Sequence, residues 1–153
     1  MSEGNAEGRL HLPDFLPYRF ATLSNRISRT IATLYGARFR LTIPEWRIMA
    51  VLGDEPELSA GEVAARTAMD KVAVSRAVSR LLEAGRIERH FAATDQRRSV
   101  LALSEEGRRI YREIVPLALS YERALTKHLA PDEIAMLDRL LSRLESLPLE
   151  DYP

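Results

Sequence analysis

The chain has 153 residues, of which 46% are hydrophobic and 29% are charged, a balance typical of one globular domain rather than a disordered chain. It has no cysteine, which excludes disulfides, thiolate zinc sites and a cysteine nucleophile. No apolar run approaches the roughly 18 residues of a membrane helix, and the acidic, polar N-terminus is unlike a signal peptide. We therefore expect a cytoplasmic protein with no membrane partner.

The net charge is zero, but the charges are unevenly distributed. Residues 66–98 hold eight basic and four acidic residues, whereas residues 131–153 hold six acidic and two basic residues. A basic region can attract phosphate even in a neutral chain. The middle of the chain is therefore a candidate for nucleic-acid binding.

The N-terminal part predicts two helices after a flexible arm at residues 1–15. Apolar residues recur at steps of three and four over residues 17–38, which indicates a first helix. Thr42 and Glu45 have the spacing of a capping box, and Pro44 suits a first helical turn. A second helix is therefore predicted to begin there.

Two more helices with a tight turn between them are predicted next. Ser59 and Glu62 again have capping-box spacing and precede a short, alanine-rich helix. The following stretch, DKVAVSRAVSRLLEAG, has Asp70 as its N-cap residue and Gly85 as its C-cap glycine. Its apolar side chains recur on one helical face, namely Val74, Ala77, Val78, Leu81 and Leu82.

A β-hairpin is predicted after this helix. Residues 86–91 and 99–103 have the composition of two short strands. The polar segment between them has no Asn-Gly pair, so we expect a long, mobile loop rather than a tight turn. The order of helix, turn, helix and hairpin predicts a mainly α fold with a small β-hairpin wing, that is, a winged helix-turn-helix.

The C-terminal part predicts two more helices. The first runs from Ser104 to about Leu129, and Pro116 should kink or split it. The second begins at Pro131 and carries a stripe of leucines. This stripe could pack on the chain's own first helix, but we expect it to pack on a second copy of the chain.

The polar face of the helix at residues 70–85 has the chemistry of a DNA-contacting surface. A helix fits the major groove, and acidic side chains on its outer face would repel phosphate. Serine can bond to phosphate or bases, and arginine can bind guanine through two hydrogen bonds. A wing arginine can enter the minor groove, and we expect Asp95 to pair with one and fix its direction.

An ordinary solvated surface remains the alternative for each basic residue taken alone. The combination of capped helices, an acid-poor face and a basic wing favours binding to double-stranded DNA. The predicted contacts are Lys71, Val72, Ser75, Arg76, Ser79, Arg80, Asp95, Gln96, Arg97 and Arg98.

Residues 58–107 resemble the winged helix of MarR-family transcriptional regulators. Val74-Ser75-Arg76 is similar to a Val-Thr-Arg common in the recognition helix of that family. Residues 82–89 follow the family's LE-x-x-G pattern, except that Arg86 takes a hydrophobic position. Residues 95–97 match the D-x-R signature of the wing.

The likeness continues beyond the wing. Residues 101–107 resemble the family's L-x-L-T-x-x-G, and the flanking helices extend the likeness over residues 16–147. The resemblance implies one unit at 16–147, with a winged lobe at about 42–104 and a C-terminal tail at 148–153.

The resemblance also implies a homodimer whose dimerisation helices lie at about 16–40 and 105–147. Such a dimer binds a pseudopalindrome whose half-sites lie about 10 base pairs apart. The expected interface residues are Leu16, Phe20, Leu137, Leu140, Leu141, Leu144 and Leu147.

Many members of the family bind a small aromatic or anionic effector between the dimer base and the DNA-binding lobe. Residues on the first two helices lie near that crevice in the family's layout, and an arginine beside an aromatic ring could hold a carboxylate or, with several arginines, an acyl-CoA. Alternatively, the aromatic residues belong to the core and the arginines pair with acids such as Glu45. The candidates are Tyr18, Arg19, Arg26, Phe39, Trp46 and Arg47.

The predicted function is a ligand-responsive, sequence-specific transcriptional regulator. We expect a repressor that releases its operator on binding a small aromatic or anionic effector. The alternative is a winged-helix protein-interaction module. A catalytic role lacks support, because His11, His90 and His128 are scattered without metal-ligand spacing and no nucleotide-binding motif is present. No cofactor is expected.

Overall fold

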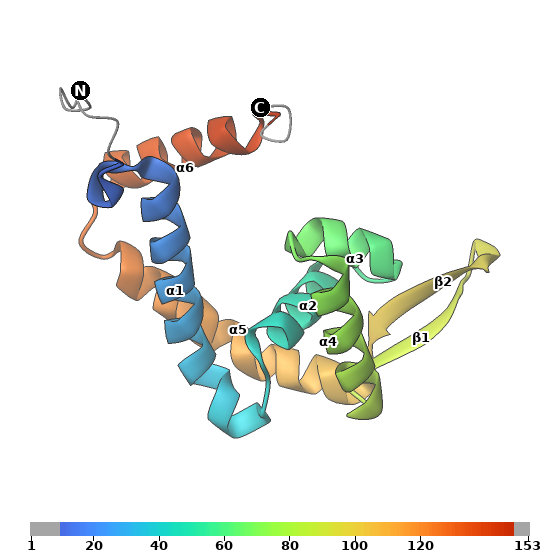
Figure 1. The fold of residues 1–153 in the computed structure, drawn as a ribbon. Helices are drawn as coiled ribbons and strands as arrows, with labels where there is room; N and C mark the ends of the chain where they lie inside the picture. Colours follow the sequence, from blue (N-terminus) through green and yellow to red (C-terminus); the bar gives the residue numbers. More distant parts are fainter. Residues whose placement is uncertain (1–9, 149–153) are drawn as a thin grey trace. The chain divides into compact units, whose positions relative to one another are not determined.

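The structure is a computed structural model that describes residues 10–148 (Figure 1). A 3-10 turn and six helices flank one hairpin, in the order η1 (Leu12–Asp14), α1 (Leu16–Phe39), α2 (Ile43–Asp54), α3 (Ala60–Thr67), α4 (Lys71–Glu83), β1 (Ile87–Ala92), β2 (Asp95–Leu103), α5 (Glu105–Thr126) and α6 (Pro131–Glu145). The chain forms two compact units, with the boundary after Pro116 inside α5. The mainly α winged-helix fold is confirmed, and residues 1–9 of the expected arm lie outside the described residues.

The predicted helix starts are formed by the expected side chains. Thr42 Oγ1 accepts the amide of Glu45 at 3.4 Å, and a Glu45 carboxylate oxygen accepts the amide of Thr42 at 2.8 Å. Ser59 and Glu62 make the same reciprocal pair at the start of α3. Each pair satisfies backbone donors that a helix N-terminus leaves without partners.

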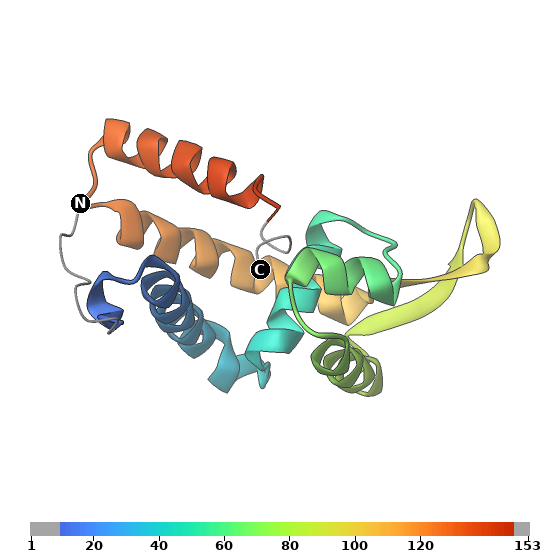
Figure 2. The same cartoon turned by 45° about the horizontal axis from the view of Figure 1, so that its top comes forward.

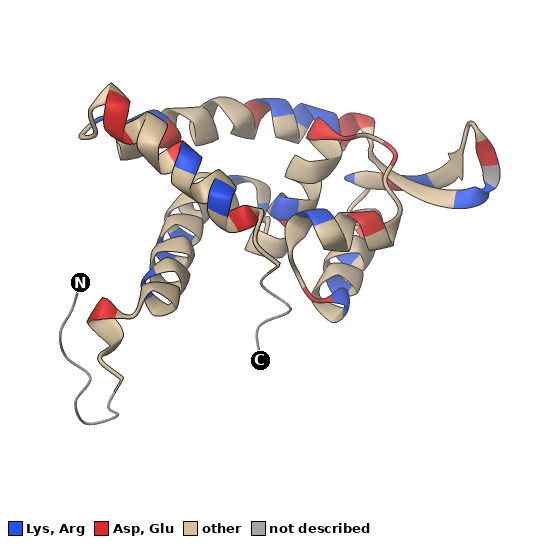
Figure 3. Cartoon of the chain, turned by 90° about the horizontal axis from the view of Figure 1, so that it is seen from above, with Lys and Arg blue, Asp and Glu red and all other residues tan. Residues whose placement is uncertain are grey.

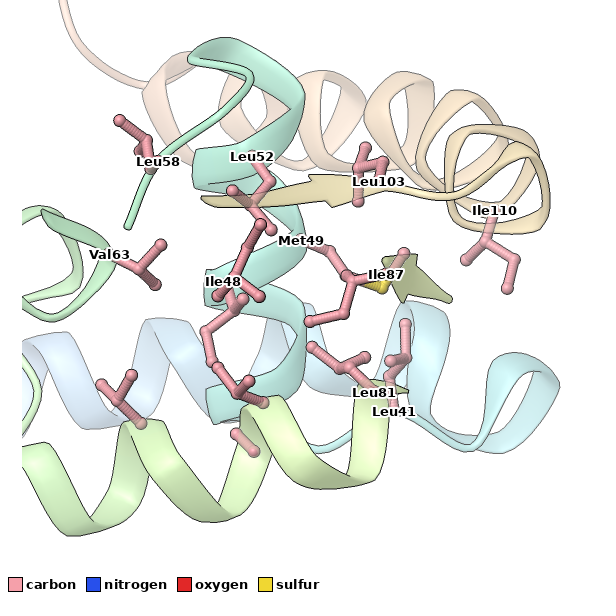
Figure 4. Packing of buried hydrophobic residues seen from close by; sticks show 14 of the residues in the cluster. Leu41, Ile48, Met49, Leu52, Leu58, Val63, Leu81, Ile87, Leu103 and Ile110 are labelled. Atoms are coloured by element: carbon pink, nitrogen blue, oxygen red, sulfur yellow. The ribbon is translucent and has the colours of Figure 1, made fainter. Parts of the chain in front are cut away.

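The core of the first unit is built around α2. Ile48, Met49 and Leu52 are almost completely buried, and Leu81 of α4 and Ile87 of β1 lie in the same cluster (Figure 4). α3, α4 and the base of the hairpin all pack on α2. Its three apolar residues therefore determine the positions of these elements. The core therefore positions α4 and the wing on one body.

The hairpin projects from this body (Figure 2). Its strands are antiparallel, with Ile87 opposite Leu103 and Phe91 opposite Ser99. A backbone hydrogen bond of 2.7 Å from the Leu101 amide to the Leu58 carbonyl joins the segment before α3 to the base of β2. This third extended segment was not predicted, because a single bridge leaves no periodic pattern.

The expected long loop in the wing is wrong. The turn consists of residues 93–94, and β2 begins directly after it. The register then shifts, because Ala92 pairs with Asp95 whereas Phe91 pairs with Ser99. Residues at such an irregularity do not follow the regular pairing of the ladder. Their polar side chains therefore resemble those of a loop in the sequence, although they belong to β2.

The base of the wing is locked against α5 by Gly107. A Cβ atom at this position would lie 1.9 Å from the carbonyl oxygen of Arg86, so only glycine fits without movement. Ser104 joins the same junction, because its hydroxyl donates to the Gly85 carbonyl at 2.7 Å and accepts the Gly107 amide at 3.0 Å. The end of α4 and the start of α5 are thereby held together.

The second unit begins at Leu117 and contains the end of α5 and all of α6. α5 is one helix that includes Pro116, so the proline does not split it. Every residue of α6 is exposed, including its apolar stripe. Within residues 10–148, no helix is long and apolar enough to cross a membrane.

Candidate nucleic-acid interface

α4 has one buried face and one exposed face, as its sequence predicts. Val74, Ala77, Val78 and Leu81 are buried against the core. The predicted contact residues on the other face are all exposed, namely Lys71, Val72, Ser75, Arg76, Ser79 and Arg80. The exposed face therefore presents cations, hydroxyls and one apolar side chain, the groups that contact phosphates, base edges and thymine methyl groups.

Both ends of α4 are fixed by local hydrogen bonds. Asp70 Oδ1 accepts the Ala73 amide at 2.8 Å, which confirms the predicted N-cap. Gly85 has a φ of 65°, and the Arg86 amide donates to the Leu81 carbonyl at 2.9 Å. This is the hydrogen-bonding pattern of a Schellman cap, which requires the left-handed conformation that glycine adopts readily.

The two arginines on the exposed face differ in their surroundings. Arg80 Nη1 lies 3.9 Å from a carboxylate oxygen of the buried Glu45, the capping residue of α2. Arg76 has no carboxylate of the described residues within 4.0 Å. The guanidinium of Arg76 therefore has fewer acidic partners that could compete with DNA than the guanidinium of Arg80 has.

The wing differs from the prediction in how Asp95 is used. Its Oδ1 accepts the backbone amide of Arg97 at 2.9 Å, and it forms no ion pair with an arginine side chain of the described residues. The expected pairing with a guanidinium is therefore wrong. The carboxylate stabilises the register shift in β2 instead, because it gives a partner to an amide that the shift removes from the ladder.

Arg97 and Arg98 have different positions although they are neighbours. The side chain of Arg97 is exposed, whereas Arg98 donates to Glu62 of α3. The side chain of Gln96 lies outside the described residues. Among the predicted wing contacts, Arg97 is the arginine with no acidic partner in the described chain.

Glu62 connects the wing to the helix-turn-helix. It caps α3 through Ser59 and also accepts from Arg98, which comes from β2. The hydrogen bonds from the amide and hydroxyl of Ser59, followed by that from Arg98, lower the pKa of Glu62 to about 2. Glu62 is thus ionised at neutral pH and holds the wing toward α3.

A cavity of about 260 Å³ lies beside the exposed face of α4. Its α3 wall consists of Ala60, Gly61 and Ala64, whose small side chains leave this space. Lys71 of α4 and Arg89 of β1 also line it. Figure 3 shows basic positions on α4 and along the wing.

Arg89 was missed because strand alternation predicts that it shares a face with the core residue Ile87. Ile87 is buried, but Arg89 is exposed and Phe91 is 65% exposed. The hairpin leaves the core after its first residues, so alternation no longer distinguishes a buried face. No signal in the sequence marks where this departure begins.

The comparisons with known proteins agree with this geometry. A family model described as MarR family matches residues 41–98. The HTH-type transcriptional regulator MgrA of Staphylococcus aureus is 24% identical over 88% of this chain and 90% of that protein. A MarR/EmrR family transcriptional regulator from Acinetobacter sp. ADP1 has a TM-score of 0.82 and 27% identity, covering 89% of this chain and 96% of that one.

Residues 41–98 match the MarR family, and the similarity in fold to a solved regulator of that family extends over 89% of the chain. A further solved structure with a similar fold is that of the PcaV transcriptional regulator of Streptomyces coelicolor in complex with its natural ligand. It has a TM-score of 0.68 and 25% identity, covering 90% of this chain and 96% of that one. The family resemblance predicted from the sequence motifs is thus confirmed.

The MarR-like effector candidates separate into two groups. Phe39 is buried in the core, and the ring of Trp46 lies 5.5 Å from Tyr35 and 6.1 Å from Tyr111, centroid to centroid. Phe39 is therefore a core residue and Trp46 packs with other rings, which is the alternative role considered for them. Tyr18 is an exposed residue of α1.

The other candidates line cavities in the first unit. Arg19 and Arg26 line a cavity of about 510 Å³ along α1, and Arg47 lines one of about 360 Å³ between α1 and α2. The alternative pairing with Glu45 does not occur for them, since the arginine near Glu45 is Arg80. Within residues 10–148 no cluster of metal-ligating side chains is present.

The predicted dimer residues expose apolar surface in the single chain. On α1, Leu16 is 50% exposed and Phe20 is 44% exposed. The five leucines of the α6 stripe are exposed to between 37% and 47%, namely Leu137, Leu140, Leu141, Leu144 and Leu147.

Proposed function

We propose that this chain is a dimeric, ligand-responsive repressor that binds a pseudopalindromic DNA operator. The observation that carries the proposal is the exposed, acid-poor face of α4, which is capped at both ends and packs on the core through its other face. An element in the major groove must be fixed in orientation for its side chains to discriminate bases. α4 meets this requirement, and its partner in recognition is the wing.

In the proposed complex, α4 contacts base edges and Arg97 contacts the minor groove or its phosphates. Arg76 and the serines of α4 supply the groups that bind guanine and phosphate. Arg98 has a positioning role, because it is engaged by Glu62. The wing and α4 then act as one surface.

Dimerisation supplies the second half-site. The exposed apolar residues of α1 and α6 would become buried on a second copy, and burial of such area is the main source of subunit affinity. Two copies related by a two-fold axis match two DNA half-sites about 10 base pairs apart. A MarR-family relative, PcaV, is known with a bound ligand, and the cavities lined by arginines on α1 and α2 offer an anionic effector a place here.

The proposal is tested by fluorescence anisotropy on DNA from directly upstream of the gene for this chain and on random DNA, at several salt concentrations. Tight, selective binding that weakens steeply with salt is expected. Arg97→Ala should weaken binding without changing the dimer. Weak and equal binding to both fragments, repeated with fragments from the rest of the genome, would contradict the proposal and favour a protein-interaction module.

A further inference from the structure

The C-terminal end of α1 is the part of that helix that packs into the core of the first unit. Tyr35 and Phe39 are the buried residues of α1, and both lie in its last two turns. The helix ends at Arg40, which has a φ of 52°, and α2 begins at Ile43. The position of α1 relative to the winged lobe is therefore determined at this end.

Arg86 reaches this end of α1 from the segment that follows α4. Its Nη2 donates a hydrogen bond to the carbonyl oxygen of Phe39, the last residue of α1. The last carbonyls of a helix have no partner within the helix, and a cation there also interacts favourably with the helix dipole. Among the described residues, the other side-chain hydrogen bonds between α1 and another element join Arg38 to α5 and Arg47 of α2 to α1. Arg86 thus connects α1 to the end of the helix that faces DNA in the proposed complex.

The backbone of Arg86 is itself fixed on both sides. Its amide donates to the carbonyl of Leu81 in α4 at 2.9 Å, and its carbonyl accepts the amide of Ser104, directly before α5, at 3.1 Å. The same carbonyl oxygen lies against Gly107, and the next residue, Ile87, is buried. The side chain of Arg86 therefore extends from a fixed point at the end of α4 to the end of α1.

A second arginine connects α4 to the first turn of α2. Arg80 Nη1 lies 3.9 Å from a carboxylate oxygen of Glu45, the capping residue of α2. Between the two helices, Leu41 is buried in the same cluster as Leu81 of α4 (Figure 4). The short segment between α1 and α2 is therefore contacted near both of its ends by arginines of α4 and of the segment after it.

We propose that Arg86 is a positioning residue that fixes the orientation of α4 relative to α1, and thereby the separation of the two copies of α4 in the dimer. Adding one base pair between two half-sites moves the second by about 3.4 Å and turns it by about 35°. A dimer whose α4 helices have a fixed separation therefore binds one spacing best. This role in spacing rests on the proposed function, whereas the orientation of α4 relative to α1 does not.

The orientation is tested by measuring a distance within one chain by electron paramagnetic resonance. The chain has no cysteine, so Asn25→Cys on α1 and Glu83→Cys on α4 provide two defined sites for nitroxide labels. Both positions are exposed. Labelled protein is mixed with an excess of unlabelled protein, so that the measured distance joins two labels of the same chain.

Arg86→Met removes the donor and keeps an unbranched side chain, whereas Arg86→Lys keeps a donor for the Phe39 carbonyl. Arg86→Met should broaden the distribution of distances between the labels at least twofold, and Arg86→Lys should restore most of the narrow distribution. Arg86→Gln, whose polar side chain is shorter, should broaden it without adding apolar surface. Arg112→Met, at an exposed arginine of α5, is the control for a lost charge and should change nothing. An unchanged distribution in Arg86→Met and Arg86→Gln would overturn the proposal.

The spacing role is tested by anisotropy titrations of duplexes that carry the two operator half-sites with zero, one or two base pairs inserted between them. The unmodified protein should bind the duplex without an insertion at least tenfold more tightly than the other two. Arg86→Met should reduce this preference to threefold or less, with an unchanged sedimentation coefficient. A lower unfolding temperature with an unchanged preference would assign Arg86 to stability alone and overturn its role in spacing.

Failure of this inference can be distinguished from failure of the proposed function. Equal binding of the unmodified protein to operator and random DNA would contradict the proposed function, while a broadened distribution in Arg86→Met would still support the positioning of α4 by Arg86. Selective operator binding with an unchanged distribution in Arg86→Met would instead overturn the role of Arg86 and leave the proposed function standing.

Discussion

Gly107 has a packing role that its place in a sequence motif does not reveal. The helix start at Ser104 brings the backbone of α5 against the carbonyl of Arg86, and a Cβ atom would overlap that oxygen. The same junction connects the cap of α4 to α5 through the Ser104 hydroxyl. A side chain at this position must displace the segment between α4 and β1, to which Arg86 belongs.

We predict that Gly107→Ala lowers the free energy of unfolding by about 1–3 kcal/mol, the usual cost of overpacking. Gly61→Ala is the matched control, because the nearest atom to its added Cβ is 4.0 Å away. That change should leave stability unchanged or raise it by up to about 1 kcal/mol, since alanine favours a helix. Urea unfolding followed by circular dichroism measures both, and equal effects would refute the packing role.

Glu62 predicts a specific dependence of stability on pH. Its pKa is lowered from 4.5 to about 2 in the folded protein, chiefly by Ser59 and then by Arg98. The unfolded chain therefore takes up the proton first as the pH falls. The stabilisation is complete above pH 4.5 and is lost as the pH falls toward 2.

We expect Glu62→Gln to be less stable than the unmodified protein at neutral pH and to lose less stability between pH 4.5 and about 2. Arg98→Ala should show the same change to a smaller extent, because Arg98 is the lesser cause of the pKa shift. Urea unfolding at a series of pH values is the measurement. Parallel pH profiles for Glu62→Gln and the unmodified protein would rule out this role.

Residues in local contact could be predicted from the sequence, and residues in distant contact could not. The capping pairs are three residues apart, so their spacing alone indicates them. Glu62 and Arg98 are separated by 36 residues, and no local pattern joins them. Arg86 departs from the family's hydrophobic pattern because it donates to the carbonyl of Phe39 at the end of α1.

At the scale of elements, helices were predicted better than the wing. Apolar residues recur at helical spacing along α1, α2 and α4. The helix ends predicted from this spacing therefore agree closely with the observed ends. The wing is mostly exposed, and its register shift removes the alternation on which a strand prediction depends. The faces of α4 were therefore predictable, while the conformation of Asp95 was not.

The exposed face of α4 predicts the effect of one arginine. Arg76→Ala should weaken operator binding by about 1–3 kcal/mol if the guanidinium contacts a base, with a smaller effect on random DNA. Arg112→Ala, an exposed arginine of α5, controls for the lost charge. Anisotropy titrations on both DNAs provide the comparison, and an equal loss on operator and random DNA would reassign Arg76 to a phosphate contact.

At the scale of the whole molecule, the apolar surface of α6 is the main evidence for assembly. A helix whose leucine stripe remains exposed has no packing partner for that stripe within its own unit of the described chain. The sequence showed the stripe but did not decide between a partner within the chain and a second copy. Periodicity identifies an apolar face without identifying what covers it.

Leu140→Glu should therefore weaken the dimer on the order of 100-fold, because it replaces a leucine of the proposed interface with a charge that must be desolvated. Ser142→Glu adds the same charge to an exposed polar position of α6 and should leave the dimer intact. Sedimentation equilibrium over a range of concentrations measures the dissociation constant. Equal effects of the two changes would argue against the leucine stripe as the interface.

In the proposed dimer, two copies of α4 and the wing recognise a specific DNA sequence. The most direct measurement is repeated selection of bound molecules from a pool of random double-stranded DNA, followed by sequencing. Recognition by a two-fold dimer predicts enrichment of a pseudopalindrome whose half-sites are centred about 10 base pairs apart. A pool that remains random after repeated selection with the folded dimer would contradict the claim.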